Sequence, residues 1–236
     1  VVVRDGVAYF ASSFLPWRES YLCGVDVETG ELNPAKSTFV TRHQNATLEG
    51  PMLVANGRLI VPQGRIAPLL FDQENGAKLG GLPGGGGVTI VVTEKGDVAR
   101  AEGGRAARPG QVGVFRGKER VASFPRGRSI VVRKDAFYVI DRDKIFAASR
   151  KANELLWQVD ALEPLEIIMV GSSLIVGCRD RIAAIESGTG KLIWETSVEG
   201  RVFGLAYAGG NLMAATDCGT VLCYRSTSGR PWMASG

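Results

Sequence analysis

Short apolar runs joined by tight polar turns recur along the whole chain. Six segments each hold an apolar run, a two-residue or slightly longer polar turn and a second apolar run: VVVRDGVAYFAS (1–12), MLVANGRLIVPQ (52–63), IVVTEKGDVARA (90–101), SIVVRKDAFYVI (129–140), IIMVGSSLIVGC (167–178) and GLAYAGGNLMAA (204–215). Asp5-Gly6, Asn56-Gly57 and Gly209-Gly210 are dipeptides typical of type I′ turns, whose twist matches that of antiparallel strands. We therefore expect a β-hairpin in each segment.

A third apolar run, a turn that ends in glycine and a fourth run follow each hairpin, as in RIAAIESGTGKLIWE (181–195). These turns end at Gly30, Gly76, Gly117, Gly190 and Gly229, with Asn153 in the corresponding place of the fourth copy. A four-stranded unit that repeats about every 40 residues is typical of a propeller blade. One blade cannot cover both of its own faces, so several blades must pack against one another. The pattern predicts an all-β fold, a β-propeller of four-stranded antiparallel blades.

We count about six blades in this chain, with units of approximately 1–50, 51–87, 88–125, 126–164, 165–200 and 201–236. Glycines 84–87 and the segment AEGGRAARPG (101–110) predict an irregular third blade. The segment SFLPWRESY (13–21) is an insert in the first unit. Its Trp17 lies off the repeat, either at a binding surface or packed within the loop.

The blade motif combines the turn glycines with tryptophans that follow them. Trp157 lies four residues after Asn153, Trp194 four after Gly190, and Trp232 three after Gly229. Small residues stand six places before the turn end: Gly24, Ala147, Ala184 and Cys223. A large aromatic side chain beside a small residue fits a tight contact between blades, so we interpret these tryptophans as structural. Asp26 and Asp72, four places before their glycines, are predicted to cap the turn.

The phrases CGVDVETGEL (23–32), LLFDQENGAKL (69–79), AAIESGTGKLIW (183–194) and LCYRSTSGRPW (222–232) resemble the repeat of the pyrroloquinoline-quinone-like (PQQ-like) propeller family. The resemblance covers nearly the whole chain and implies a bacterial protein of the periplasm or the extracellular space. Rings of that family often have seven or eight blades, so the chain forms either a six-bladed ring or part of a larger one. The family includes both quinoprotein dehydrogenases and non-enzymatic assembly scaffolds.

The residues do not match the family's catalytic set. Catalytic members hold PQQ between a tryptophan and a disulfide of adjacent cysteines, beside a calcium ion and a catalytic aspartate. The cysteines here, at 23, 178, 218 and 223, are not adjacent, and no residue aligns with the calcium ligands or the aspartate. We predict no catalytic residue and no metal site. No cofactor is evident, and PQQ with calcium is an open alternative that no residue supports. His43, the one histidine, has no nucleophile elbow nearby, and we predict that it lies in a loop.

The function favoured by the sequence is a non-catalytic binding or scaffold module for a protein partner or a small ligand. The alternatives are a PQQ-dependent quinoprotein dehydrogenase or its inactive remnant, and the docking domain of a larger exported enzyme. Residues 100–151 hold 14 Arg and Lys against 5 Asp and Glu, but lack the interleaved aromatics of a nucleic-acid platform, so no nucleic acid is expected. No apolar stretch reaches the length of a transmembrane helix.

The four cysteines are expected to be free, buried thiols. A two-residue turn at Cys218-Gly219 would place Cys223 opposite Ala214, so the two cysteines of this hairpin are not expected to form a disulfide.

Overall fold

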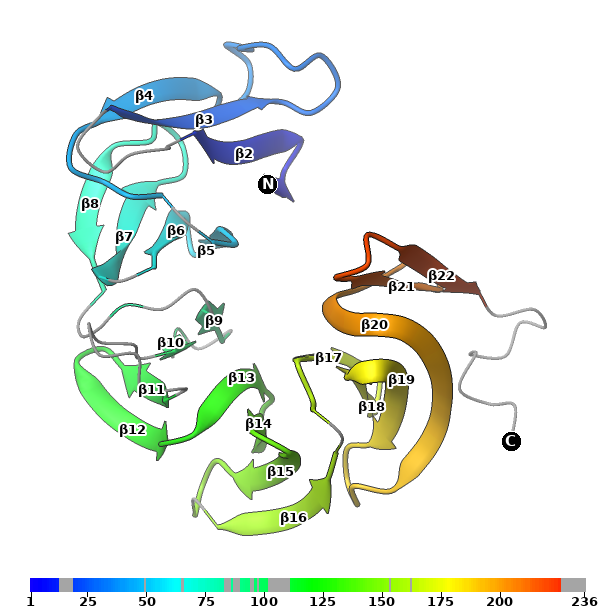
Figure 1. The fold of residues 1–236 in the computed structure, drawn as a ribbon. Coiled ribbons are helices and arrows are strands. Elements are labelled where there is room, and N and C mark those ends of the chain that lie inside the picture. Colours follow the sequence, from blue (N-terminus) through cyan, green and yellow to red (C-terminus); the bar gives the residue numbers. More distant parts are fainter. Residues whose placement is uncertain are drawn as a thin grey trace. The chain divides into compact units, whose positions relative to one another are not determined.

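The computed structural model describes residues 1–12, 19–48, 50–64, 66–82, 86, 90–93, 96, 98–101, 111–152, 154–161 and 163–225, and these form β-strands and turns without a helix. The strands make five antiparallel sheets with the arrangement of a β-propeller, as expected (Figure 1). The chain divides into two compact units, residues 1–123 and 124–236, which are described separately. No helix long and apolar enough to cross a membrane occurs among the described residues.

The first unit contains three four-stranded sheets. The first sheet has the order β1 (Val2–Arg4), β2 (Val7–Ser12), β3 (Ser20–Asp26), β4 (Phe39–His43). The second has the order β5 (Leu53–Ala55), β6 (Arg58–Gln63), β7 (Ile66–Asp72), β8 (Lys78–Gly81). The third has β9 (Ile90–Val92), β10 (Val98–Ala101), β11 (Val112–Arg116) and β12 (Glu119–Phe124), whose last residue belongs to the second unit. Strands β9 and β10 have only three and four residues.

The second unit contains one four-stranded and one six-stranded sheet. The four-stranded sheet has the order β13 (Gly127–Val132), β14 (Ala136–Asp141), β15 (Lys144–Ser149), β16 (Leu155–Asp160). The six-stranded sheet has β17 (Glu166–Val170), β18 (Ser173–Gly177), β19 (Arg179–Glu186), β20 (Leu192–Ala208), β21 (Asn211–Thr216) and β22 (Val221–Arg225). The 17-residue β20 is the fourth strand of one quartet and the first strand of the next (Figure 1). The boundary expected between the repeats 165–200 and 201–236 therefore falls inside a strand.

The predicted hairpin dipeptides adopt the backbone that a type I′ turn requires. Both residues have positive φ at Asp5-Gly6 (51° and 74°), Asn56-Gly57 (52° and 70°) and Gly209-Gly210 (55° and 79°). Only glycine and small polar residues tolerate this region at low cost, which explains why these dipeptides occupy the turns.

The predicted turn has the same hydrogen bond in four quartets, in three of which it ends at glycine. The N–H of its first residue donates to the carbonyl five residues later, in the pairs Asp26–Glu31, Asp72–Ala77, Ser149–Glu154 and Glu186–Lys191, at 2.8–2.9 Å. The predicted caps are confirmed for both aspartates: Asp26 Oδ1 accepts from the N–H of Glu28 at 3.0 Å, and Asp72 Oδ1 from that of Glu74 at 2.9 Å. The repeated phrase therefore encodes a repeated turn.

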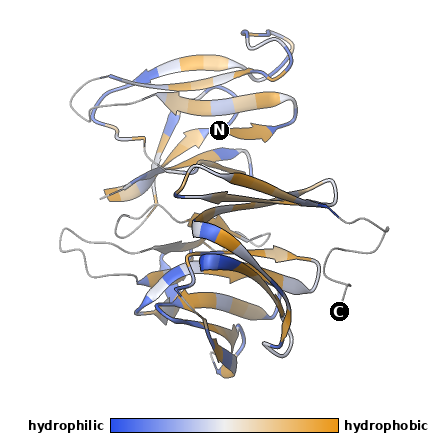
Figure 2. Ribbon diagram, turned by 45° about the vertical axis from the view of Figure 1, so that its right-hand side comes forward, coloured by the Kyte–Doolittle hydropathy of each residue, from blue (hydrophilic) through white to orange (hydrophobic). Residues whose placement is uncertain are grey.

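The cores lie between consecutive sheets. In the first unit, buried residues of the first and second sheets pack together around Tyr9, Leu22, Leu59 and Phe71. In the second unit, one core joins the β13–β16 sheet to β17–β19 and another joins that quartet to β20–β22. The first strands of neighbouring quartets touch, with β5 contacting β1 and β9, and β17 contacting β13 and β20. Figure 2 shows apolar residues along the strands of the sheets. This face-to-face packing is that of propeller blades.

Three expectations about single residues are wrong. Cys223 lies opposite Met213, not Ala214, because the β21–β22 turn is longer than two residues, with the Thr216 N–H donating to Thr220 O at 3.0 Å. All four cysteines are free as expected, but Cys218 and Cys223 are exposed; only Cys23 and Cys178 are buried. His43 is the last residue of β4 and not a loop residue.

Candidate binding site

An aromatic residue of one sheet covers the turn glycine of the next sheet at two places. In the first, which we call the β4 seam, Phe39 and Thr41 of β4 lie against Gly76, so closely that a Cβ on Gly76 would be 2.6 Å from Phe39 Cδ2. In the second, the β16 seam, Trp157 and Val159 of β16 lie against Gly190, and a Cβ there would be 2.8 Å from Trp157 Cε3. Both glycines also have φ near 70°. Only glycine satisfies both conditions.

Each seam has a side-chain hydrogen bond between sheets. Trp157 Nε1–H donates to Ser187 O at 2.9 Å in the β16 seam, and the Thr41 hydroxyl donates to Gly76 O at 3.3 Å in the β4 seam. His43 extends the β4 seam, with its ring 4.7 Å from that of Phe71 in an edge-to-face arrangement and its Nε2 2.9 Å from Thr41 Oγ1. Burial is the main reason that the pKa of His43 is lowered.

The other residues of the predicted motif are placed as follows. Trp194 packs edge-to-face on Tyr224, with ring centroids 5.7 Å apart. Gly30 has a φ of 75°, and a Cβ there would meet nothing within 4 Å. The residues Trp17, Asn153, Gly229 and Trp232 lie outside the described residues.

Residues 31–38, which we call the roof loop, extend the first glycine-ended turn beyond the length seen in the other quartets. Its base is held by Asp26, which is 3% exposed. Asp26 Oδ2 accepts from Asn33 Nδ2 at 2.7 Å, and Oδ1 accepts from Lys36 Nζ at 2.9 Å. The bond from Asn33, followed by those from Lys36 and the Glu28 N–H, lowers the pKa of Asp26 to about 2. The roof loop is therefore fixed by buried charge and not by an apolar core.

Hydrogen bonds within the roof loop also hold its own residues together. The Asn33 N–H donates to Thr38 Oγ1 at 2.7 Å, and the Thr38 hydroxyl donates to Asn33 O at 3.0 Å. The Ala35 N–H donates to Asn33 Oδ1 at 3.0 Å. A loop whose backbone is satisfied in this way keeps one shape, as a recognition loop on a rigid scaffold requires.

A hollow of about 860 Å³ lies between the roof loop and the turns of the first two sheets. Its lining consists of Asp5, Val7, Tyr9, Pro34, Ala35, Lys36, Ser37, Gly57, Asp72, Gln73 and Glu74. Tyr9, 1% exposed, contributes its hydroxyl, which accepts from Gln73 Nε2 at 3.4 Å. All of these residues belong to the first unit.

The charges of this hollow are mainly negative. Among its lining residues Asp5, Asp72 and Glu74 are acidic, and Lys36 is the one basic residue. The ammonium of Lys36 is already paired with Asp26 Oδ1. Arg4 Nε lies 3.3 Å from Asp5 Oδ2, and both side chains are exposed. Such a surface, polar and moderately acidic, suits a partner that offers N–H donors or a positive charge.

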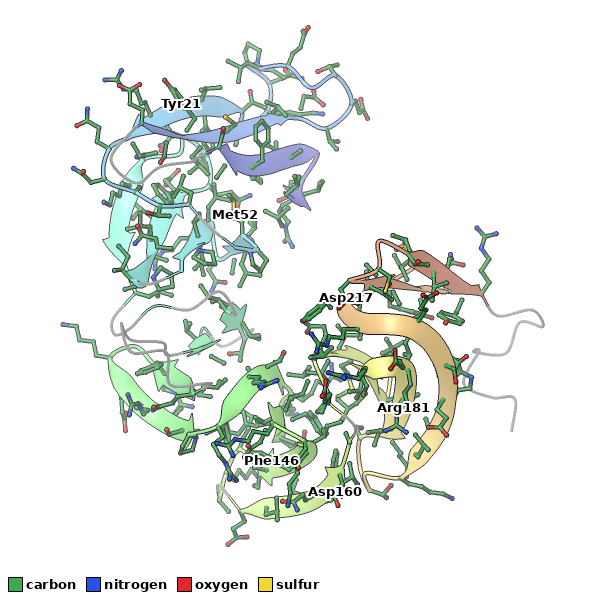
Figure 3. All side chains as sticks on the ribbon, in the orientation of Figure 1. Tyr21, Met52, Phe146, Asp160, Arg181 and Asp217 are labelled. Carbon is green, nitrogen blue, oxygen red and sulfur yellow. The ribbon has the colours of Figure 1, made fainter. Side chains whose placement is uncertain are left out.

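A second, smaller hollow of about 240 Å³ lies in the second unit between β15–β16 and β18–β20. Its lining is largely aliphatic, with Asp160, Cys178 and Arg181 as polar members; Asp160 and Arg181 are labelled in Figure 3. Arg181 Nη1 donates to Glu195 Oε2 at 3.1 Å. Burial raises the pKa of the Cys178 thiol, against the effect of Arg181, so this thiol is a poor nucleophile at neutral pH.

The described residues do not fit a calcium–PQQ centre. No group of three or more His, Cys, Asp or Glu side chains gathers among them in a way that could hold a metal ion. Calcium prefers six to eight oxygen ligands, whereas in the first hollow Asp72 caps its own turn and Asp5 is paired with Arg4. We derive no reaction through such a group.

The roof loop and the β4 seam were not predicted from the sequence. The insert of the first unit was expected at residues 13–21, which lie partly outside the described residues, and Phe39 was not connected with the motif. One signal in the sequence could have revealed that Phe39 belongs to the motif. Gly24 lies across from Phe39, as Ala147 lies across from Trp157 and Ala184 from Trp194. The small residue therefore marks the strand position that faces the aromatic.

Solved structures with the same fold are β-propellers. BamB from Moraxella catarrhalis is 14% identical, with a TM-score of 0.59, over 95% of this chain and 81% of that one. The C-terminal WD40 domain of Sif2 is 10% identical, with a TM-score of 0.71, over 94% and 67%. A chain of the mitotic checkpoint complex is 12% identical, with a TM-score of 0.69, over 87% and 68%. Comparisons with protein-family models and with curated proteins gave no match.

Proposed function

We propose that this protein is a non-catalytic binding module, a propeller scaffold that holds a protein partner at the hollow under the roof loop. The observation that carries the proposal is the roof loop itself: an extension of one turn, fixed at its base by Asp26, beside a hollow of about 860 Å³. A rigid sheet framework that presents one elaborated loop is the usual design of a recognition surface.

The hollow's chemistry defines the partner. The acidic lining and the buried Tyr9 suit a segment with Lys or Arg side chains, or with free backbone N–H groups, projecting from a partner protein. The mitotic checkpoint complex, in which one propeller neighbour is found, is a protein assembly by its name, and this supports a scaffold role.

We also propose that the repeat is of the PQQ-like type and that the protein works in the periplasm or outside the cell. The support is the resemblance of the repeated phrases, together with the shared turn geometry in four quartets. A binding assay with PQQ and calcium, followed by protein fluorescence, tests the cofactor separately. We expect no saturable change; a stoichiometric one would favour the quinoprotein alternative.

Site-specific photo-crosslinking tests the binding site. A photoreactive amino acid at Ser37, which is exposed and lines the hollow, is compared with one at Thr189, which is exposed on the shorter turn of another quartet. In the native host we expect a discrete protein adduct from position 37 and none from position 189. Ser37→Trp, which fills the rim, should reduce binding of the identified partner at least tenfold. Equal adducts at both positions, or binding unaffected by Ser37→Trp, would contradict the proposal.

A further inference from the structure

The smaller hollow of the second unit, about 240 Å³ in volume, has buried and apolar walls. We call it the β19 hollow, and its lining residues all belong to the second unit. Ile145, Val176 and Ile185 of this lining are at most 5% exposed. Asp160 and Leu192 are exposed and therefore mark the mouth. A space of this volume holds roughly eight groups of the size of a water molecule.

One polar atom at the β19 hollow is buried without a partner. Arg181 Nε has no hydrogen-bond partner among the described residues, whereas Nη1 of the same guanidinium donates to Glu195 Oε2 at 3.1 Å. Burial raises the pKa of the Cys178 thiol and Arg181 lowers it, so the thiol lies near the guanidinium, but a thiol is only a weak acceptor. A buried donor without an acceptor costs free energy, and a ligand oxygen that reaches Nε would remove this cost.

The repeat does not require an arginine at position 181. Arg181 lies five residues before Glu186, which begins the turn of its quartet, and the equivalent positions of other quartets hold Tyr21, Ala67 and Lys144. These four side chains differ in size, polarity and charge, so no shared packing role in the blade explains them. Arg181 is therefore a feature of the β19 hollow and not of the repeat.

A water molecule is a poor occupant of this site. A buried water is normally held by two to four polar groups, and cavities with apolar walls stay dry. Near Arg181 Nε the described lining adds only the weak acceptor of Cys178, and the remaining interior is largely aliphatic. An organic molecule with one acceptor and an apolar body fits these walls better.

The charges around the hollow favour an uncharged ligand. The positive charge of Arg181 is already paired with Glu195, and Asp160 places a negative charge at the mouth. A carboxylate ligand would approach Asp160 without an unpaired positive charge to offset the repulsion, and an ammonium ligand would present only donors to the Arg181 N–H. A carbonyl oxygen accepts from Nε and meets neither conflict.

We propose that the β19 hollow binds a small, uncharged aliphatic carbonyl compound, a ketone, ester or amide of about eight non-hydrogen atoms, whose oxygen accepts from Arg181 Nε. Its apolar body lies against Ile145, Val176 and Ile185. This site goes beyond the proposed function, because its residues belong to the second unit and the hollow under the roof loop belongs to the first. The failure of one proposal therefore leaves the other standing.

Methyl NMR spectroscopy with three probes of equal size tests the proposal: 2-heptanone, hexanoate and heptylammonium. We expect 2-heptanone to shift the methyl signals of Ile145, Val176 and Ile185 and the Nε–H signal of Arg181 saturably, with a Kd below about 1 mM. Hexanoate and heptylammonium should bind about tenfold more weakly or less. The absence of a saturable shift with 2-heptanone, shifts at other methyl groups only, or equal binding of a charged probe would overturn the proposal.

Substitution of the arginine separates its hydrogen bond from the apolar contact. Arg181→Met keeps a long side chain but removes the donor, so 2-heptanone should bind about tenfold more weakly. Arg179→Met is the matched control, because Arg179 lies on the same strand, has Nε 2.7 Å from Glu163 Oε2 and is not among the described lining residues. The control should bind 2-heptanone as the wild type does. Equal affinities of the wild type and Arg181→Met would overturn the proposal.

Two substitutions at the mouth keep the test decisive if Arg181→Met does not fold. Leu192→Trp, at a residue that is 48% exposed, narrows the opening and should weaken binding of 2-heptanone about tenfold. Asp160→Asn removes the negative charge and should strengthen binding of hexanoate about threefold while leaving that of 2-heptanone unchanged. Wild-type affinity for 2-heptanone in Leu192→Trp, or no gain for hexanoate in Asp160→Asn, would contradict the proposal.

Discussion

The β4 seam and the β16 seam meet the same packing requirement with different side chains. In each, residues i and i+2 of a fourth strand cover the glycine that ends the next turn: Phe39 and Thr41 over Gly76, Trp157 and Val159 over Gly190. The polar link between sheets comes from the threonine hydroxyl in the first and from the indole N–H in the second. The contact geometry is thus constant, while the residues that make it vary.

The two seams also differ in how the chain reaches them. Trp157 follows its own turn end by four residues, whereas Phe39 follows Gly30 by nine, because the roof loop intervenes. Strand pairing nevertheless places both aromatics across from the small residues Gly24 and Ala147. A propeller can therefore lengthen one turn into an extended loop without losing the seam, since cross-strand pairing and not spacing along the chain sets the contact.

Removing the aromatic residue should have the largest effect on stability. Phe39→Ala is expected to lower the free energy of unfolding by about 3–4 kcal/mol and Trp157→Ala by about 3 kcal/mol, because each leaves a cavity over a glycine that cannot fill it. Leu155→Ala, at a residue 61% exposed on β16, is the control and should cost less than about 0.5 kcal/mol. Urea denaturation measures all three. A cost below about 1 kcal/mol for Trp157→Ala would remove the β16 seam from the comparison.

Adding one methyl group to the turn glycines should have the next largest effect. Gly76→Ala and Gly190→Ala are expected to cost about 2–4 kcal/mol, since each combines positive φ with a collision against an aromatic ring. Gly30→Ala has a similar φ of 75° but nothing within 4 Å of the added carbon, so about 1 kcal/mol is expected. Thermal and urea unfolding report the difference. Equal costs at positions 30 and 76 would show that backbone strain alone explains the glycines.

Removing only the polar links should cost less. Trp157→Phe keeps an aromatic ring but leaves Ser187 O without its indole donor, and Thr41→Val removes the bond to Gly76 O. We expect each to lower the free energy of unfolding by about 1–2 kcal/mol, with the larger cost at Trp157, whose bond is shorter and whose ring is also reduced. Denaturant titration of both variants is the measurement. No loss for Trp157→Phe would assign the β16 seam to packing alone.

The roof loop should add a dependence on acid pH that the β16 seam lacks. The pKa of Asp26 is about 2 in the folded protein and near 4 when unfolded, so its contribution is complete above about pH 4 and is lost as pH falls toward 2. Denaturation curves between pH 1.5 and 5 should show this loss in the wild type and not in Asp26→Asn. Lys36→Met removes one partner and so raises the pKa of folded Asp26 toward its unfolded value; the loss should become smaller and end at a higher pH. Parallel pH curves for wild type and Asp26→Asn would exclude Asp26 as the base of the roof loop.

Prediction from the sequence is most accurate where a local backbone constraint acts. Asp5-Gly6, Asn56-Gly57 and Gly209-Gly210 form the expected turns because few residues tolerate two consecutive positive φ angles. It failed where strand register decides. Cys223 is one position from its expected partner, because the length of the β21–β22 turn is not encoded in the Cys218-Gly219 dipeptide alone.

The residues of the candidate site were not foreseen, although their elements were. Asp26 was interpreted only as a turn cap, and it is one; yet the same carboxylate also holds Asn33 and Lys36 of the roof loop. Nothing in the spacing of these residues distinguishes Asp26 from Asp72, which caps a turn without an extended loop. Asp26 holds a loop and Asp72 does not because residues 31–38 fold back onto the Asp26 carboxylate.

The amino-acid sequence by itself determined the strands, their hairpin turns and the repeat of about 40 residues, because turn dipeptides and apolar runs act over a few neighbouring residues. Only the tertiary structure decided which aromatic covers which glycine, which carboxylate supports a loop, and where the hollow lies. Those features depend on residues brought together from different strands and sheets, and register and packing, not spacing along the chain, bring them together.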